Sequence, residues 1–300
     1  MKSNTYCIIM AGGIGTRFWP MSRKSMPKQF LDILGTGKSF IRATYERFAA
    51  LVPTENFLVV TNRAYKDLVL QHIPELDEKQ ILCEPRGRNT APCIAYAAYS
   101  LLKSNPDAEM IVTPSDHLIL NETDFHAIIR ECMEFADKND ALMTVGINPT
   151  RPDTGYGYIQ KSNSDVISRV KCFTEKPNLE MAQTFIESGE FFWNAGIFIW
   201  KVRNIIEAFS QHLPEHHALF SAIIDDLGTE LANAFTLSRL NLCINERFIN
   251  RRSTIISTNF GIQELEAHYG ERNFSRIFSS YTPLRFFGED IRIKKKVENA

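Results

Sequence analysis

Short apolar runs alternate with helical patterns along the first half of this chain of 300 residues. The apolar runs have the length of strands and are continuous rather than alternating in polarity, at 6–10, 57–61, 80–83, 110–113 and 142–147. Helical patterns lie between most of them, at 39–51, 63–72, 90–103 and 124–138. Continuous apolar strands separated by helices are typical of βαβ units. The alternation therefore predicts an α/β fold with a Rossmann-like, mostly parallel sheet that is flanked by helices.

Polar loops follow three of the predicted strands, after residues 10, 83 and 113. The carboxyl ends of parallel strands meet at one edge of a sheet, and ligands of such folds gather at that edge. We therefore expect these three loops to contribute to a single binding site.

The first of these loops is rich in glycine and is followed by cations. Gly12, Gly13 and Gly15 come directly after the strand, Arg17 follows them, and Lys28 comes later in the same loop. Glycine allows backbone N–H groups to approach an anion closely, because no Cβ blocks the approach and positive φ is permitted. Cations at fixed offsets can then bind phosphate oxygens. The loop is predicted to be a phosphate cradle.

Two common phosphate-binding motifs do not fit this loop. A dinucleotide fingerprint needs a third glycine where this chain has the bulky Phe18. A Walker P-loop needs four residues between its glycines, and the nearest run, at 35–39, is too short. Instead, Trp19-Pro20 and Pro27-Lys28 indicate an extended loop that returns Lys28 toward the glycines.

Whole-chain properties limit the classes of partner. The net charge of −1 favours neither nucleic acid nor a membrane surface. No apolar run approaches the ~18–20 residues that span a bilayer, and we expect no signal peptide at the N-terminus. None of the cysteines forms a C-x-x-C pair, so we expect reduced core thiols in a cytoplasmic protein. These cysteines are Cys7, Cys83, Cys93, Cys132, Cys172 and Cys243.

A family resemblance becomes visible at the glycine loop. The run GGIGTRFWPMSRKSMPKQF, residues 12–30, resembles the signature of sugar-1-phosphate nucleotidyltransferases, in particular the mannose-1-phosphate guanylyltransferase branch. Further blocks follow in the same order and spacing as in that family over roughly the first 210 residues. They are EPRGRNTAP (84–92), PSDH (114–117), TGYGYI (154–159), FTEKP (173–177) and WNAG (193–196). The resemblance implies condensation of GTP with mannose 1-phosphate to GDP-mannose and pyrophosphate.

The resemblance implies roles for residues on the nucleotide side. Arg17 and Lys28 would hold the triphosphate and stabilise the departing pyrophosphate, with the three glycines and Thr16 lining the cradle. A carboxylate at Glu84 suits guanine, whose N1–H and N2–H₂ donate on one edge. The remaining residues expected to contact the nucleotide are Arg88, Asn89, Thr90 and Ser115. Asn89 precedes a helical pattern, so its role could instead be that of an N-cap.

Asp116 is the expected ligand of Mg²⁺. It follows a strand, where one carboxylate can bind the ion while phosphate oxygens and waters complete the coordination. The neighbouring His117 fits either a ligand or a structural histidine.

The second half of the matched region would bind the sugar. Strands are expected at 156–160, 166–174 and 196–200, with a helix at 179–188. Lys176 would bind the sugar phosphate and Glu175 the sugar hydroxyls. Gly155 and Gly157 would let the backbone approach the pyranose, and Asn194 would contact its hydroxyls.

The chain departs from the family pattern after this region. The family carries a second metal-binding aspartate later in the sequence, and its pattern is not found here; Asp225 and Asp226 are the nearest candidates to substitute for it, but they come too early in the chain. We therefore divide the chain into a catalytic domain, 1–220, and a divergent segment, 221–300. Two alternatives stay open for the function: a nucleotide-sugar-binding or regulatory paralogue with weak catalysis, and the same chemistry on another NTP and hexose 1-phosphate. A homodimer is also open.

Overall fold

The computed structural model describes residues 4–13, 15, 18–84 and 89–221. Its strands are β1 (Thr5–Met10), β2 (Phe57–Asn62), β3 (Ile81–Glu84), β4 (Glu109–Pro114), β5 (Met143–Ile147), β6 (Gly157–Lys161), β7 (Val170–Glu175) and β8 (Phe191–Lys201). Its α-helices are α1 (Phe40–Ala49), α2 (Lys66–His72), α3 (Thr90–Ser104), α4 (Glu122–Asn139), α5 (Leu179–Ser188), α6 (Val202–His212) and α7 (Pro214–Ser221). Short 3₁₀ helices are η2 (Lys28–Phe30), η3 (Thr54–Asn56), η4 (Arg63–Tyr65) and η5 (Glu78–Gln80).

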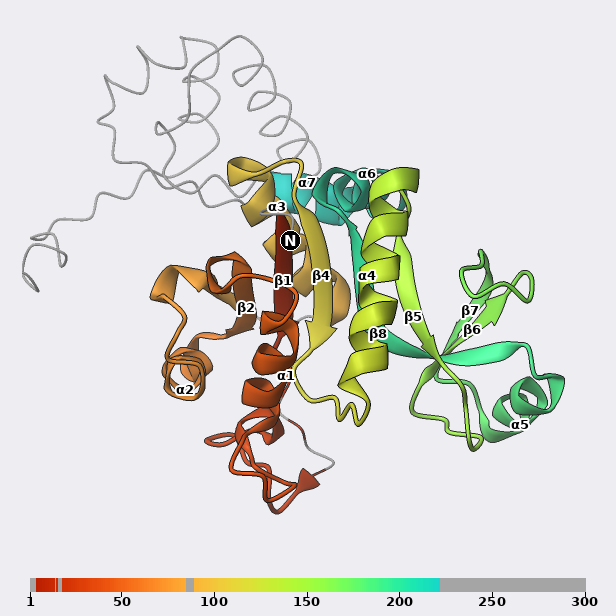
Figure 1. Cartoon of the computed structure of the whole chain (residues 1–300), viewed down its shortest axis with the longest axis horizontal. Coiled ribbons are helices and arrows are strands. Elements are labelled where there is room, and N and C mark those ends of the chain that lie inside the picture. Colours follow the sequence, from red (N-terminus) through yellow and green to blue (C-terminus); the bar gives the residue numbers. More distant parts are fainter. Residues whose placement is uncertain (1–3, 14, 16–17, 85–88, 222–300) are drawn as a thin grey trace, which may run out of the picture. The chain divides into compact units, whose positions relative to one another are not determined.

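The strands form one sheet in the order β3-β2-β1-β4-β8-β6-β7, with β5 also paired to β8 (Figure 1). Strand β1 lies between β2 and β4, β2 pairs with β3, and all three of these pairings are parallel. The predicted α/β fold with a parallel sheet flanked by helices is confirmed. The carboxyl ends of β1, β3 and β4 therefore lie at one edge of the sheet, as the loop argument requires.

The later strands pair antiparallel. Strand β8 runs antiparallel to β4, β5 and β6, and β6 runs antiparallel to β7. The expectation that 142–147 continues the parallel series is wrong, because β8 occupies the position beside β4 and β5 pairs with β8 instead. A continuous apolar strand does not specify the direction of its neighbour.

Helices cover both faces of the sheet. Cys7 and Ile9 of β1 face a core that includes residues of α1, α2 and α4. Ile8, between them, faces a second core built with α3 and α6. Side chains of a strand alternate between faces, so burial on both sides explains the continuous apolar runs.

Side-chain caps explain where several helices begin. The Asn178 side chain accepts a hydrogen bond from the Met181 amide, and α5 occupies the predicted 179–188. Asn121 caps α4 in the same way through the Asp124 amide, so that helix begins two residues before the predicted start. Strand β8 begins at Phe191, earlier than the predicted 196, because Trp193 pairs with Tyr158 of β6.

The cysteines within the described residues are all free. Cys7, Cys93 and Cys132 are buried, as predicted. Cys172 is exposed, so the expectation of a core thiol is wrong there, since it lies on β7 at the end of the sheet order where most side chains are exposed. Within the described part of the chain, no helix is both long and apolar enough to cross a bilayer.

Candidate active site

The loops after β1 and β4 meet through an ion pair. Lys28 Nζ of η2 contacts Asp116 Oδ2, which lies two residues beyond the end of β4. The two side chains retain 30% and 17% of their exposure, so both remain partly accessible to a ligand. The structure therefore brings together a cation and an acid that the sequence placed in separate loops.

Two of the loop glycines are closely approached by predicted site residues. Gly15 has φ +67°, and a Cβ there would lie 2.7 Å from Lys28 Cγ. A Cβ on Gly12 would lie 3.1 Å from Glu84 Oε2, at the end of β3. Glycine is required at residue 15 both by its left-handed backbone and by contact with the Lys28 stem. Gly13 is exposed, and no described atom lies within 4 Å of a Cβ built on it.

Two residues that the sequence analysis did not single out support this loop. The Gln29 side-chain amide is buried and donates to the carbonyls of Ala11, at 2.9 Å, and Gly13, at 3.0 Å. The Thr61 hydroxyl donates to the same Ala11 carbonyl at 2.8 Å. The only signal for Gln29 in the sequence was its position, because a polar side chain directly precedes Phe30, which is buried.

Glu84 lies at the edge of the cradle and is only 8% exposed. Burial raises the pKa of its carboxyl above the ordinary value of 4.5. Its charge in turn adds to the burial that raises the pKa of the nearby Cys93 thiol. The acid predicted to bind guanine is therefore a desolvated group against the glycine loop.

Asn89 stands immediately before α3 with φ 66° and ψ −161°. Its side chain makes no capping hydrogen bond with the described residues, so the N-cap alternative gains no support. A non-glycine residue with positive φ is uncommon and is frequently found at functional sites. Thr90 begins the helix.

The Asp116 loop, residues 115–121, connects β4 to α4. Ser115 is buried, and burial is the main cause that lowers the pKa of His117. Asp116 opposes this shift, while the charges of Arg47 and Lys28 add to it. His117 is thus a buried imidazole whose charged form is disfavoured.

Asp116 also fits the chemistry expected of a Mg²⁺ ligand. Among the described residues, no group of three His, Cys, Asp or Glu side chains could enclose an ion. Mg²⁺ commonly binds one or two carboxylates together with substrate phosphates and waters. A single accessible carboxylate beside a phosphate cradle suits that mode of binding, and the assignment stays a prediction.

The predicted sugar-side residues gather where β6 and β7 pair. A Cβ on Gly157 would lie 2.7 Å from Glu175 Oε2. Lys176 Nζ contacts Glu175 Oε1 at 2.7 Å, and both side chains are more than half exposed. Lys176 has φ 46°, which turns the chain sharply after β7.

Asn194 and Gly155 are held by local hydrogen bonds. Asn194 Oδ1 accepts from the Thr144 hydroxyl at 3.1 Å and from the Gly196 amide at 3.0 Å. Because these bonds occupy Oδ1, the donor group of the Asn194 side chain is Nδ2. The Asp153 carboxylate accepts from the Gly155 amide at 2.8 Å, a support that the sequence analysis did not predict.

The sugar side connects to the nucleotide side through β8 and β4. A Cβ on Gly196 would lie 3.4 Å from Pro114, which directly precedes Ser115 and Asp116. The Gly196 amide bonds to Asn194, so a short series of contacts joins Asn194 to the Asp116 loop.

Several predicted residues lie outside the described part of the chain. They are Thr16, Arg17, Arg88, Asp225 and Asp226. Their roles, and the predicted division of the chain at residue 220, stay predictions.

Lys28 and Asp116 meet beside the glycine loop at the carboxyl end of the parallel strands, where sheets of this kind bind their ligands. Residues 6–237 match the family described as nucleotidyl transferase. The chain belongs to the nucleotidyl transferase family. That membership confirms the resemblance found in the sequence.

Curated relatives match this nucleotidyl transferase chain over about 70% of its length. It is 40% identical over 214 residues to the xanthan biosynthesis protein XanB of Xanthomonas campestris, covering 71% of this chain and 45% of the relative. It is 39% identical over 226 residues to a mannose-1-phosphate guanylyltransferase of Escherichia coli, covering 72% and 48%. The chain thus spans about half the length of these curated relatives.

Solved structures agree with the fold. A protein described as mannose-1-phosphate geranyltransferase from Thermus thermophilus has a TM-score of 0.66 at 35% identity, covering 73% of this chain and 63% of that chain. A protein described as mannose-6-phosphate isomerase from Helicobacter pylori has a TM-score of 0.61 at 31% identity, covering 73% and 80%.

Proposed function

We propose that this nucleotidyl transferase condenses GTP with mannose 1-phosphate to form GDP-mannose and pyrophosphate. The observation that carries the proposal is the contact of Lys28 with Asp116 beside the glycine loop. Relatives at about 40% identity that are named mannose-1-phosphate guanylyltransferase supply the substrate pair. The proposal includes the cytoplasm as the location, which the free cysteines of the described residues support.

The proposed reaction is a displacement at the α-phosphorus of GTP. An oxygen of mannose 1-phosphate forms the new P–O bond, and the bond between the α-phosphorus and the bridging oxygen to the β-phosphate breaks. Catalysis of this kind depends on positioning and on stabilising charge rather than on covalent chemistry of the protein. Backbone groups of the glycine loop would bind the triphosphate, and Lys28 with Arg17 would stabilise the charge that develops on pyrophosphate.

The two substrates would be oriented by different groups. An ionised Glu84 accepts from N1–H and N2–H₂ of guanine, a pair of donors that adenine lacks. Lys176 would bind the phosphate of mannose 1-phosphate, while Glu175 and Asn194 bind its hydroxyls. Asp116 would hold Mg²⁺, which when bound neutralises phosphate charge and orients the oxygens of the nucleotide.

Pyrophosphate release from the full chain tests the proposal. We expect release with GTP, mannose 1-phosphate and Mg²⁺, and we expect Asp116→Asn to reduce kcat/KM roughly 100- to 1000-fold because a neutral amide replaces the charged ligand. The variant should also lose the dependence of GTP binding on Mg²⁺, measured by calorimetry.

Other outcomes discriminate the alternatives. Nucleotide binding without pyrophosphate release would favour a binding or regulatory paralogue. Release with a different nucleotide or hexose 1-phosphate would keep the chemistry and change the substrates. An unchanged Mg²⁺ titration in Asp116→Asn would place the metal ligand elsewhere.

A further inference from the structure

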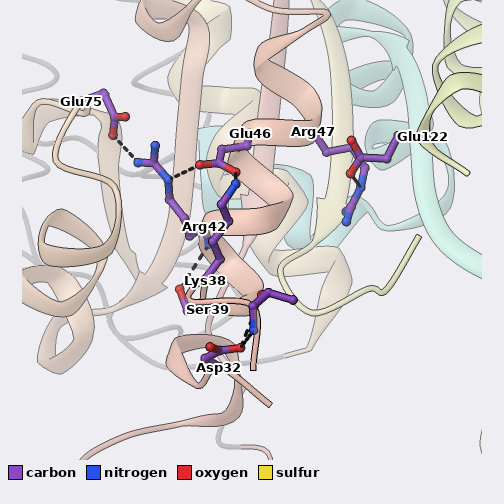
Figure 2. A network of polar contacts seen from close by, with 9 residues as sticks. Asp32, Lys38, Ser39, Arg42, Glu46, Arg47, Glu75 and Glu122 are labelled. Atoms are coloured by element: carbon purple, nitrogen blue, oxygen red, sulfur yellow. Dashed lines mark hydrogen bonds and ion pairs between the residues drawn. The ribbon is translucent and has the colours of Figure 1, made fainter. Parts of the chain in front are cut away.

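Arg47 is a buried cation that the proposed reaction does not use. It lies on α1 and is 4% exposed. Its Nε donates to Glu122 Oε1 at 3.0 Å, and Glu122 is the first residue of α4 (Figure 2). A buried guanidinium is costly unless it is paired, so the burial of Arg47 depends on this contact with Glu122.

A second polar contact joins the same two helices. His126 Nε2, one turn further along α4, lies 2.8 Å from the carbonyl oxygen of Arg47 and donates to it. Phe125 packs edge-on against Phe48 of α1, with ring centroids 5.5 Å apart. Residues 47 and 48 therefore hold the first turn of α4 by an ion pair, a hydrogen bond and an aromatic contact.

The first turn of α4 determines where the Asp116 loop ends. One end of this loop is fixed by β4 within the sheet, and its other end continues directly into Glu122. The side chains of Leu118 and Leu120 within the loop are exposed, so packing restrains it weakly there.

Helix α1 supports the other partner of the ion pair as well. It packs against η2, which carries Lys28. One helix therefore contacts the segment of Lys28 and anchors the loop of Asp116. A shift of α4 relative to α1 would change the separation of the two charged groups.

We propose that Arg47 is a positioning residue, which holds Glu122 and His126 so that the Asp116 loop presents its carboxylate beside Lys28. The inference rests on the proposed function only in taking Asp116 as the metal ligand. Residues that orient a metal ligand without touching the metal commonly change metal affinity when they are replaced.

The chain offers a matched control on the same helix. Arg42, also on α1, pairs with Glu46 at 2.8 Å and with Glu75 at 2.6 Å. Figure 2 shows these pairs on the side of α1 away from Glu122. Arg42→Met thus removes ion pairs from α1 without touching the Asp116 loop.

Hydrogen exchange of the full chain tests the positioning role without any assumption about activity. We expect Arg47→Met to accelerate exchange of the Asp124 and Phe125 amides, which bond to Asn121 at the end of the loop, roughly 10-fold or more, because the first turn of α4 loses its anchor. Arg42→Met should leave those amides unchanged. Equal effects of the two variants, or no effect of Arg47→Met, would overturn the inference.

Kinetics then measures the consequence for metal use. Arg47→Met should raise the Mg²⁺ concentration for half-maximal pyrophosphate release roughly 10-fold, with kcat at saturating Mg²⁺ changed much less. Arg47→Lys should restore part of this loss, and Arg42→Met should match the wild type. A fall in kcat that saturating Mg²⁺ does not correct would contradict a positioning role.

Two further experiments distinguish a failure of the inference from misfolding of the variant and from a failure of the proposed function. If Arg47→Met does not fold, Glu122→Gln replaces it, because Glu122 is half exposed and glutamine keeps the shape of the side chain without its charge. The same faster exchange is expected. If the wild type releases no pyrophosphate, the proposed function fails, and the exchange experiment alone decides the role of Arg47.

Discussion

Glu84 would combine its proposed recognition role with a cost in stability. Its carboxyl lies against Gly12 with little exposure, and it is the acid proposed to read guanine. Replacing it by glutamine should reduce the preference for GTP over ATP roughly 10- to 100-fold, because hydrogen bonds to a charged group contribute about 1.5–3 kcal/mol. Competition binding with the two nucleotides measures this preference.

The pH dependence of the free energy of unfolding tests separately whether the Glu84 carboxyl is desolvated. Its pKa is raised in the folded protein above the ordinary value of 4.5, so its contribution to stability is fully present below that pH. The contribution is lost as pH rises through the folded pKa. The free energy of unfolding of the wild type, relative to Glu84→Gln, should therefore fall as pH rises above 4.5. A constant difference would show that the carboxyl is not desolvated.

At the scale of elements, the glycine loop depends on a side chain outside it. Gln29→Leu removes both hydrogen bonds that hold the carbonyls of Ala11 and Gly13. We expect a loss of about 1–3 kcal/mol in the free energy of unfolding, measured in urea, because two hydrogen bonds that contribute about 0.5–1.5 kcal/mol each are removed. We also expect kcat/KM to fall roughly 10- to 100-fold, because the phosphate cradle is displaced.

Gln80 is the matched control for this loop. Its buried side chain also donates to two carbonyls, those of Thr54 at 2.7 Å and Phe57 at 2.9 Å, at the opposite end of β2 from Thr61. The Gln80 side chain also accepts from the Asp77 amide at 2.9 Å, so Gln80→Leu should lose at least as much stability and keep its kcat/KM. Equal losses of activity in both variants would show that Gln29 acts through stability alone.

Elements that show a clear hydrophobic pattern in their own sequence were predicted well. The strands of the parallel block and helices α1 to α5 appear near their expected positions, since both faces of the sheet are covered by helices. The direction of β5 and the length of β8 were not predicted, because pairing with a distant strand decides both. Thr61 and Gln29 were missed for a related reason: their hydrogen bonds reach 50 and 18 residues along the chain.

At the scale of the whole described region, β8 joins the parallel part of the sheet to its antiparallel part. Its later part pairs with β4, beside the parallel strands that carry the glycine loop and Asp116. Its earlier part pairs with β6, beside the antiparallel strands that carry Gly157 and Glu175. The proposed binding groups for nucleotide and for sugar phosphate thus belong to different parts of the sheet.

This separation predicts that a change on the antiparallel side affects one substrate. Lys176→Met should raise KM for mannose 1-phosphate roughly 10- to 100-fold, because a charged hydrogen bond to phosphate is lost, and should leave KM for GTP nearly unchanged. Lys161→Met is the control, since Lys161 ends β6 and lies over the Phe192 ring at 5.2 Å, away from the proposed sugar residues of the β7 turn. Steady-state kinetics with each substrate varied in turn measures both constants. A rise in KM for GTP equal to that for mannose 1-phosphate would mean that Lys176 binds the nucleotide phosphates, and the assignment of substrates to the two parts of the sheet would then be wrong.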